Sequence, residues 1–190
     1  MLARQDSRAI SLARIALSVA LLTACAWVTV PIGVIPVTLQ NFAIALAVCA
    51  LKPKESIAAV VCYLLLGLVG VPVFSSMRGG IGVLLGPTGG FLWGYLIGTI
   101  AACLTMYVVK KAHNTGVVAC AVKCAIQLIL CYTCGVIQFM FVMNVGLLAA
   151  LAACVAPFVL IDTAKIVVAI ICAQAVLKAL SAVHARKASN

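Results

Sequence analysis

A carboxylate and an ammonium group, Asp162 and Lys165, lie three residues apart inside an apolar stretch of this sequence. The chain has three acidic residues, and the other two, Asp6 and Glu55, flank apolar runs instead of interrupting one. An ionised side chain inside a bilayer costs on the order of 3 kcal/mol, so it is usually kept for a function. Spacing i, i+3 puts both groups on one helix face, where they suit a neutral ligand with adjacent N–H and C=O groups, such as a urea or an amide. The alternative is a helix N-cap at Asp162 with a neighbouring ion pair.

A second candidate for ligand contact is the segment from Arg78 to Gly90, which holds six glycines in thirteen residues. Glycine lets backbone N–H groups approach anionic oxygens closely, and Arg78 is a cation that could attract a carboxylate. A position of Arg78 among lipid headgroups fits equally well. The segment lacks the GxxxxGK[ST] pattern of a phosphate-binding loop, so no ATPase activity is expected of this chain.

The composition indicates which elements must position these residues. Hydrophobic residues make up 66% of the 190 residues and charged residues 8%, whereas soluble domains have about 45–50% and about 25%. We therefore expect an all-α membrane protein with a single integral membrane domain over residues 1–190. A span needs about 20 apolar residues, which predicts six transmembrane helices and a short outer helix at about 147–156. The six predicted spans are about 10–30, 38–51, 56–70, 91–109, 117–143 and 162–180.

The positive charges predict how these spans are oriented. Of the thirteen Lys and Arg residues, eleven would lie on one side of the membrane, while Arg78 lies on the other and Lys165 near the start of the last span. The positive-inside rule then makes both termini cytoplasmic, with Lys123 snorkelling to that surface. Cations spread in short groups do not form the basic face of a nucleic-acid-binding protein. The eleven residues are Arg4, Arg8, Arg14, Lys52, Lys54, Lys110, Lys111, Lys123, Lys178, Arg186 and Lys187.

The second and third spans are too short to cross a bilayer fully as helices. Their 14 and 15 residues cover roughly 21–23 Å, against a hydrocarbon core of roughly 30 Å. Both border Gly/Pro-rich segments, 31–40 and 71–91, and irregular backbone at membrane depth survives where it lines protein or a cavity. We expect these outer loops to close a binding cavity, unless the membrane is simply thin and the loops are ordinary.

Small residues and cysteines complete the pattern. Ala16, Ala20 and Ala24 recur every four residues, which allows close packing of another helix, either within the chain or from a partner protein. Cys131 and Cys134 form a CxxC pair without the further ligands that a zinc site needs, so no metal or other cofactor is expected. Leu22-Thr-Ala-Cys25 resembles a lipoprotein cleavage site, but cleavage would leave five spans and spoil the charge asymmetry.

Several motifs, in order over about residues 31–170, resemble the BioY family, the biotin-specific substrate-binding (S) components of energy-coupling factor (ECF) transporters. The family usually has Pro-Gly where this chain has Leu160-Ile161, and often Tyr where it has Phe91. The matching motifs are Pro36-Val-Thr-Leu-Gln40, Tyr63-Leu-Leu-Leu-Gly67 with Gly70-Val-Pro-Val-Phe74, Gly86-Pro-Thr-Gly-Gly90, and Pro157-Phe158 with Asp162 and Lys165.

The resemblance implies a high-affinity biotin-binding subunit of a vitamin importer in a prokaryotic plasma membrane. It would capture biotin outside and release it inside, with energy from a membrane coupling protein (T component) and two ATP-binding subunits. Asp162 and Lys165 would contact the ureido ring of biotin, and the helix carrying Ala16, Ala20 and Ala24 would meet the T component. The other residues expected around the ligand are Thr38, Gln40, Arg78, Thr88, Gly89, Gly90 and Phe91.

Two other classes of function remain open. A self-sufficient proton-coupled secondary transporter of a small polar solute would use Asp162 as its proton carrier, but no convincing inverted repeat is visible. An intramembrane enzyme would need a nucleophile with a base, or a metal cluster. His113 and His184 lie in the predicted cytoplasmic flanks, far from Asp162, so no enzymatic activity is expected.

Overall fold

The computed structural model describes the backbone of residues 2–31, 35–108 and 116–189, and the side chains of 8–31, 35–105 and 116–182. Within these ranges the chain is almost entirely helical. The elements are α1 (Leu2–Trp27), β1 (Thr29–Val30), β2 (Val37–Thr38), α2 (Gln40–Ala50), α3 (Pro53–Leu68), the 3-10 helix η1 (Ser75–Met77), α4 (Ile81–Leu85), α5 (Gly89–Val108), α6 (Val117–Met143), α7 (Leu147–Cys154) and α8 (Val159–Ser189).

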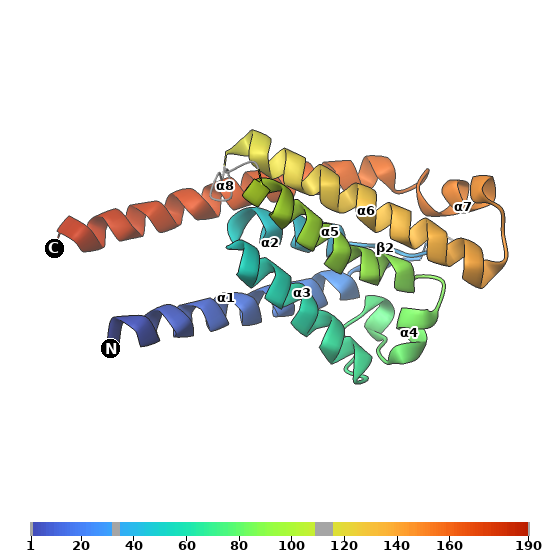
Figure 1. Ribbon diagram of the computed structural model, residues 1–190, viewed down its shortest axis with the longest axis horizontal. Coiled ribbons are helices and arrows are strands. Elements are labelled where there is room, and N and C mark those ends of the chain that lie inside the picture. Colours follow the sequence, from blue (N-terminus) through green and yellow to red (C-terminus); the bar gives the residue numbers. More distant parts are fainter. Residues whose placement is uncertain (1, 32–34, 109–115, 190) are drawn as a thin grey trace.

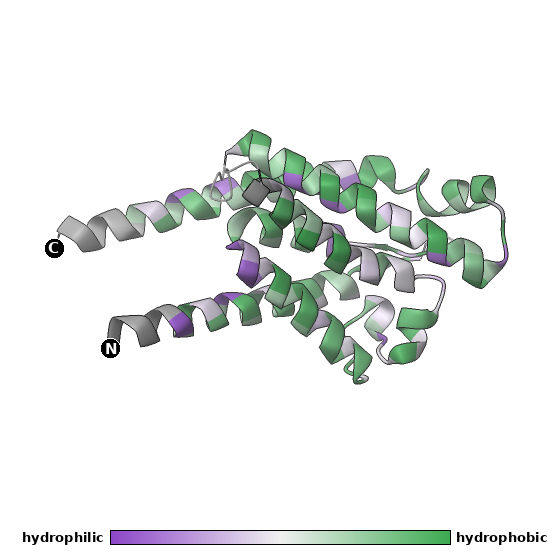
Figure 2. Ribbon diagram, viewed as in Figure 1, coloured by the Kyte–Doolittle hydropathy of each residue, from purple (hydrophilic) through white to green (hydrophobic). Residues whose placement is uncertain are grey.

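The long helices run side by side as a bundle (Figure 1). The start of α1 and the end of α8 project from the same end of the bundle, whereas α4, α7 and the β1–β2 hairpin lie at the opposite end (Figure 1). Apolar residues cover most of the helical surface, and hydrophilic ones gather near the turn between α2 and α3 and toward the start of α1 (Figure 2). This surface is that of a protein solvated by lipid.

Three helices of the described chain are long and apolar enough to cross a membrane: Arg8–Trp27, Val117–Met143 and Val159–Ala182. Two shorter apolar helices are Gln40–Ala50 and Gly89–Thr105. Every predicted span contains a helix, and the span 117–143 coincides with α6. The count of six transmembrane helices and the cytoplasmic position of the termini stay predictions, because the short helices do not establish full crossings.

Some predicted boundaries are wrong for reasons of local geometry. The first helix ends at Trp27 instead of 30, because Thr29 and Val30 pair antiparallel with Thr38 and Val37 in a small hairpin. The third helix begins at Pro53, before the predicted residue 56, since proline is favourable in a first helical turn. The last helix begins before the predicted residue 162 and continues to Ser189.

Helices α5 and α6 pack closely because glycines on α5 let the two backbones meet. A Cβ atom added at Gly94 would lie 2.7 Å from Cys131 Cα, and one added at Gly98 would lie 2.7 Å from the Gln127 carbonyl oxygen. Glycines on a helix face let a neighbouring helix approach closely in lipid. The resulting pair of helices forms one wall of the bundle.

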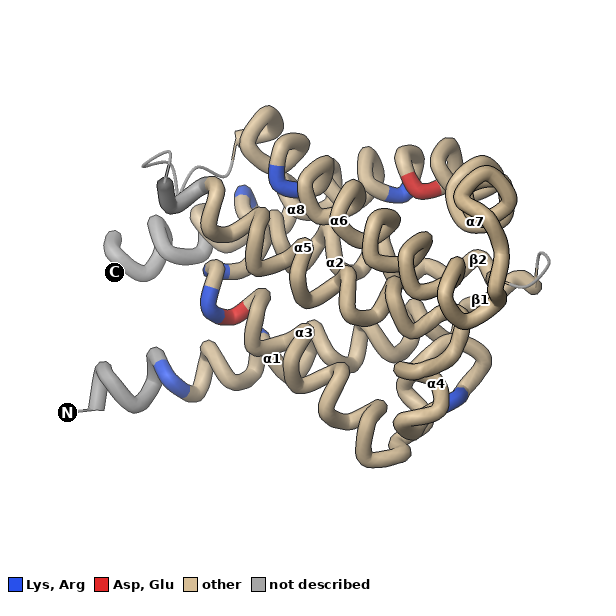
Figure 3. The backbone as a smooth tube through the Cα atoms, turned by 45° about the vertical axis from the view of Figure 1, so that its right-hand side comes forward, with Lys and Arg blue, Asp and Glu red and all other residues tan. Residues whose placement is uncertain are grey.

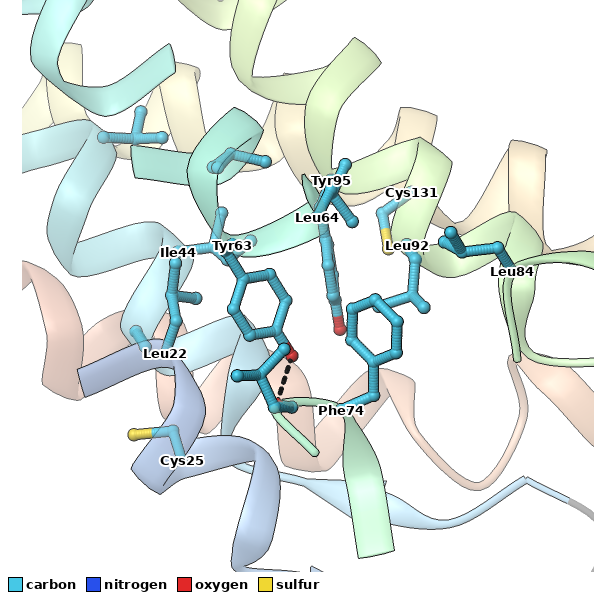
Figure 4. Packing of buried hydrophobic residues seen from close by; sticks show 14 of the residues in the cluster. Leu22, Cys25, Ile44, Tyr63, Leu64, Phe74, Leu84, Leu92, Tyr95 and Cys131 are labelled. Carbon is cyan, nitrogen blue, oxygen red and sulfur yellow. Dashed lines mark hydrogen bonds between the residues drawn. The ribbon is translucent and has the colours of Figure 1, made fainter. Parts of the chain in front are cut away.

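A buried aromatic cluster joins α3 to the loop that follows it. The rings of Tyr63 and Phe74 meet edge to face, with centroids 5.5 Å apart, and a side chain at Gly67 would collide with the Phe74 ring. The Tyr63 hydroxyl donates a hydrogen bond of 3.0 Å to the Val73 carbonyl oxygen. Figure 4 shows Tyr63, Phe74 and Tyr95 together between α3 and α5, so this cluster holds the loop against the bundle.

Most of the described Lys and Arg residues lie toward the end of the bundle that carries the termini (Figure 3). Glu55 is buried there, 2.8 Å from Ser11 Oγ and 3.7 Å from Arg14, and so ties α3 to α1. The expectation that Lys123 snorkels to the surface is wrong, because this residue is 5% exposed and belongs to the buried residues of α6. The side chains of Arg4, Lys110, Lys111, His113, His184, Arg186 and Lys187 lie outside the described part.

Candidate ligand-binding site

A cavity lies where α2, α5 and α8 begin. Space free of atoms amounts to about 560 Å³ when the open mouth is included. Both Gly/Pro-rich segments contribute to the wall, as do α6 and α7. Because three helices start here, their N-terminal ends favour negative charge and hydrogen-bond acceptors at this place. The lining residues are Pro36, Thr38, Gln40, Asn41, Ser75, Val83, Thr88, Phe91, Leu92, Tyr95, Tyr132, Cys154, Phe158, Asp162 and Lys165.

Asp162 is the centre of a hydrogen-bonded network in this wall. The residue is 3% exposed. Lys165 Nζ lies 2.7 Å from Oδ1, while Tyr132 Oη donates to Oδ2 at 2.8 Å and Asn41 Nδ2 donates to the same oxygen at 2.6 Å. Three donors from α8, α6 and α2 therefore compensate the buried negative charge, and this joins three helices at one point.

Lys165 is held by two acceptors. Besides Asp162, its Nζ donates a hydrogen bond of 2.8 Å to the Thr38 carbonyl oxygen in β2. An ammonium group has three N–H donors, so one donor remains for a ligand. The interpretation of Asp162 as an N-cap is wrong, because α8 begins at Val159 and Asp162 lies within its first turn.

Gln40 serves the framework of the cavity. Its Nε2 donates to Tyr63 Oη at 2.6 Å, and its Oε1 accepts a hydrogen bond of 3.0 Å from Thr38 Oγ1. Since the Tyr63 hydroxyl in turn donates to the Val73 carbonyl, the start of α2 is linked through α3 to the loop before η1. Both ends of the Gln40 amide are occupied, so it positions this wall.

The structure brings six of the nine predicted ligand contacts to the cavity wall: Asp162, Lys165, Thr38, Gln40, Thr88 and Phe91. The other three lie elsewhere. Gly89 and Gly90 are buried where α5 meets α6, and a Cβ at Gly90 would lie 2.7 Å from Gln138 Cβ. Arg78 is exposed, with its Nε 3.4 Å from the Ser75 carbonyl oxygen, and does not line the cavity.

Sequence reasoning missed several residues of the wall, notably Asn41, Tyr95, Tyr132 and Ser75. Asn41 carries a signal in retrospect, since it is an amide within the otherwise apolar run after Gln40. Tyr95 and Tyr132 carry no such sequence signal, because a tyrosine in a membrane helix is equally typical of the membrane–water interface. Only the packing of α5 and α6 brings Tyr95 and Tyr132 to the same cavity.

A lipid-exposed helix bundle with a small polar cavity beneath loops is the architecture of a membrane protein that captures a solute. The model of the BioY family matches residues 2–182. The chain belongs to the BioY family.

Two relatives have similar sequences over most of the chain. It is 33% identical over 177 residues to a protein named biotin transporter BioY2 from Lactococcus lactis subsp. cremoris, covering 93% of this chain and 95% of the relative. It is 37% identical over 150 residues to a biotin transporter BioY from Thermotoga maritima, covering 79% and 85%. The fold matches a crystal structure of the S-component for biotin from an ECF-type ABC transporter, with a TM-score of 0.83 over 91% of this chain and 93% of that one, at 24% identity.

Proposed function

We propose that this chain is the biotin-binding S component of an ECF-type vitamin importer in a prokaryotic plasma membrane, with both termini cytoplasmic. One observation carries the proposal: a BioY-family chain has an Asp162–Lys165 ion pair, largely shielded from solvent, in the wall of a cavity. A urea ring offers a carbonyl acceptor beside N–H donors. The free donor of Lys165 suits the carbonyl, and acceptors nearby suit the N–H groups.

The remainder of the wall supports a ligand that is partly apolar and ends in an acid. Phe91, Leu92 and Phe158 offer apolar contact, while Ser75 and Thr88 offer hydroxyl groups. The N-terminal ends of three helices favour a carboxylate in the cavity without a dedicated cation. Biotin combines these features in one molecule, with a urea, an apolar ring system and an acidic chain.

An exposed alanine face on α1 supports docking of a T component. Ala16, Ala20 and Ala24 are exposed, as small residues that receive another helix must be. An apolar groove between α1 and α3 adjoins this face. We propose that the T component packs here and that two ATP-binding subunits supply the energy for release. The groove is lined by Leu12, Ile15, Ala16, Val19, Ala20, Cys62, Leu65, Leu66 and Val69.

Calorimetric titration of biotin into the purified, detergent-solubilised full chain tests the capture function. We expect tight binding without ATP. Asp162→Ala or Lys165→Ala should each lose at least about 2 kcal/mol, because a buried polar partner is left unpaired, which is roughly thirtyfold in affinity. Lys178→Ala, an exposed lysine on the same helix, is the control and should bind as the wild type does. A folded wild-type sample without biotin binding would overturn the proposal.

A further inference from the structure

Asn41 has an unusual position in the cavity wall, because half of its amide is used and half is not. The residue is 8% exposed, and its Nδ2 donates to Asp162 Oδ2 at 2.6 Å. Its Oδ1 is buried and has no hydrogen-bond partner in the described part of the chain. A buried acceptor without a partner is costly, so its retention calls for an explanation.

The orientation of this amide follows from Asp162. An ionised carboxylate only accepts hydrogen bonds, so the NH₂ group of Asn41 must face Asp162 and the Oδ1 must face away. Two other residues of the described chain have buried unpaired side-chain atoms, Thr99 and Gln127, but neither lines the cavity. Asn41 is thus the described cavity residue that keeps an unused, buried acceptor.

Asp162 itself has little capacity left for a ligand. Its two oxygens already receive Lys165, Tyr132 and Asn41, out of about four acceptor positions on a carboxylate. Lys165, by contrast, has one free donor. The unused groups near the pair therefore include one donor on Lys165 and one acceptor on Asn41, the complement of a ligand that presents C=O and N–H side by side.

The geometry points to Asn41 as the residue that reads a ligand N–H: its Oδ1 accepts a hydrogen bond from the urea ring whose carbonyl binds Lys165, while Asp162 orients both residues. This inference rests on the proposed biotin function and assigns the selection of an unsubstituted ring nitrogen to a residue of α2. Ligands in which that nitrogen bears an alkyl group lose the hydrogen bond and leave Oδ1 unpaired.

A binding cycle with alkylated ligands tests this assignment. Biotin and its two ring N-methyl derivatives are titrated into the wild type and into Asn41→Ala. In the wild type, at least one derivative should bind about tenfold or more weaker than biotin, the effect of one hydrogen bond. In Asn41→Ala, biotin should bind about tenfold weaker, and the preference for biotin over that derivative should fall to within about threefold.

Gln127→Ala is the matched control, since Gln127 is also a buried amide with unpaired atoms but lies outside the cavity wall. It should keep both the affinity for biotin and the preference against methylation. An Asn41→Ala variant that keeps the wild-type preference overturns the assignment. If that variant does not fold, equal binding of biotin and both derivatives by the wild type overturns it. Absence of biotin binding by the wild type would instead refute the proposed function.

Discussion

At the scale of single residues, the site depends on compensating one buried carboxylate. Asp162 is nearly inaccessible, and each of its three donors comes from a different helix. Removing one member of a buried ion pair is strongly destabilising, because the remaining charge is left uncompensated. Removing both charges together is much less harmful. The pair, which we propose as part of the ligand site, is therefore also a condition for stable packing.

We expect Lys165→Met to lower the free energy of unfolding by about 3 kcal/mol, the lower end for a broken buried pair, because Tyr132 and Asn41 still donate to Asp162. Combining it with Asp162→Asn should restore most of that loss. Thermal unfolding in detergent of the wild type, Lys165→Met, Asp162→Asn and the double variant measures the coupling energy between the two residues. Lys178→Met is the control and should change stability by no more than about 0.5 kcal/mol. Strictly additive losses would contradict this account of the pair.

At the scale of elements, the cavity depends on how closely α5 and α6 approach. These helices carry Tyr95 and Tyr132, which line the same cavity, and the glycines of α5 set the distance between them. The rings of Phe91 and Tyr132 lie edge to face across this contact, with centroids 6.5 Å apart. Gln138 on α6 also donates to the carbonyl oxygens of Leu84 and Gly86, both at 2.8 Å, and so anchors the loop before α5.

Gly94→Ala should separate α5 from α6. The new Cβ would meet a backbone carbon of Cys131 at 2.7 Å, and overpacking of this kind costs about 1–3 kcal/mol. We expect a lower unfolding temperature together with weaker biotin binding. Gly146→Ala is the control, since nothing lies within 4 Å of its Cβ position and its φ is −72°. Unchanged stability of Gly94→Ala would show that the helices are not in close contact.

At the scale of the whole molecule, the candidate ligand cavity and the proposed docking face are separate surfaces. The cavity opens where α2, α5 and α8 begin, whereas the proposed docking face lies on the exposed side of α1 next to α3. A substitution on α1 should therefore separate binding from uptake, which no change in the cavity wall can do.

Ala20→Trp should abolish biotin uptake by cells that contain the complete importer, because the large ring prevents close helix packing. Binding of biotin by the purified variant should match that of the wild type. Ile129→Trp is the control, since Ile129 is an exposed apolar residue of α6 outside the groove; its uptake should be normal. Normal uptake by Ala20→Trp would exclude this face as the docking surface.

The sequence alone determined the class of protein and most helices. Apolar runs long enough to form membrane helices follow from composition, so α6 was predicted to the residue and α7 nearly so. Asp162 and Lys165 could also be identified, because a charge in an apolar run is conspicuous and the i, i+3 spacing fixes a shared face. Apolar runs and i, i+3 spacing are properties of neighbouring residues in the chain, so they can be predicted without the tertiary structure.

The tertiary structure alone decided what surrounds that pair. Asn41 and Tyr132 are 121 and 30 residues away from Asp162 in the chain, and no local pattern indicates that they meet. The positions of Gly89 and Gly90 also could not be predicted from local sequence. Their glycine-rich motif suggests a ligand-binding loop, but both residues pack against α6. The physical reason is that hydrogen-bond partners and close backbone contacts are set by which helices pack together, and that choice depends on the whole chain.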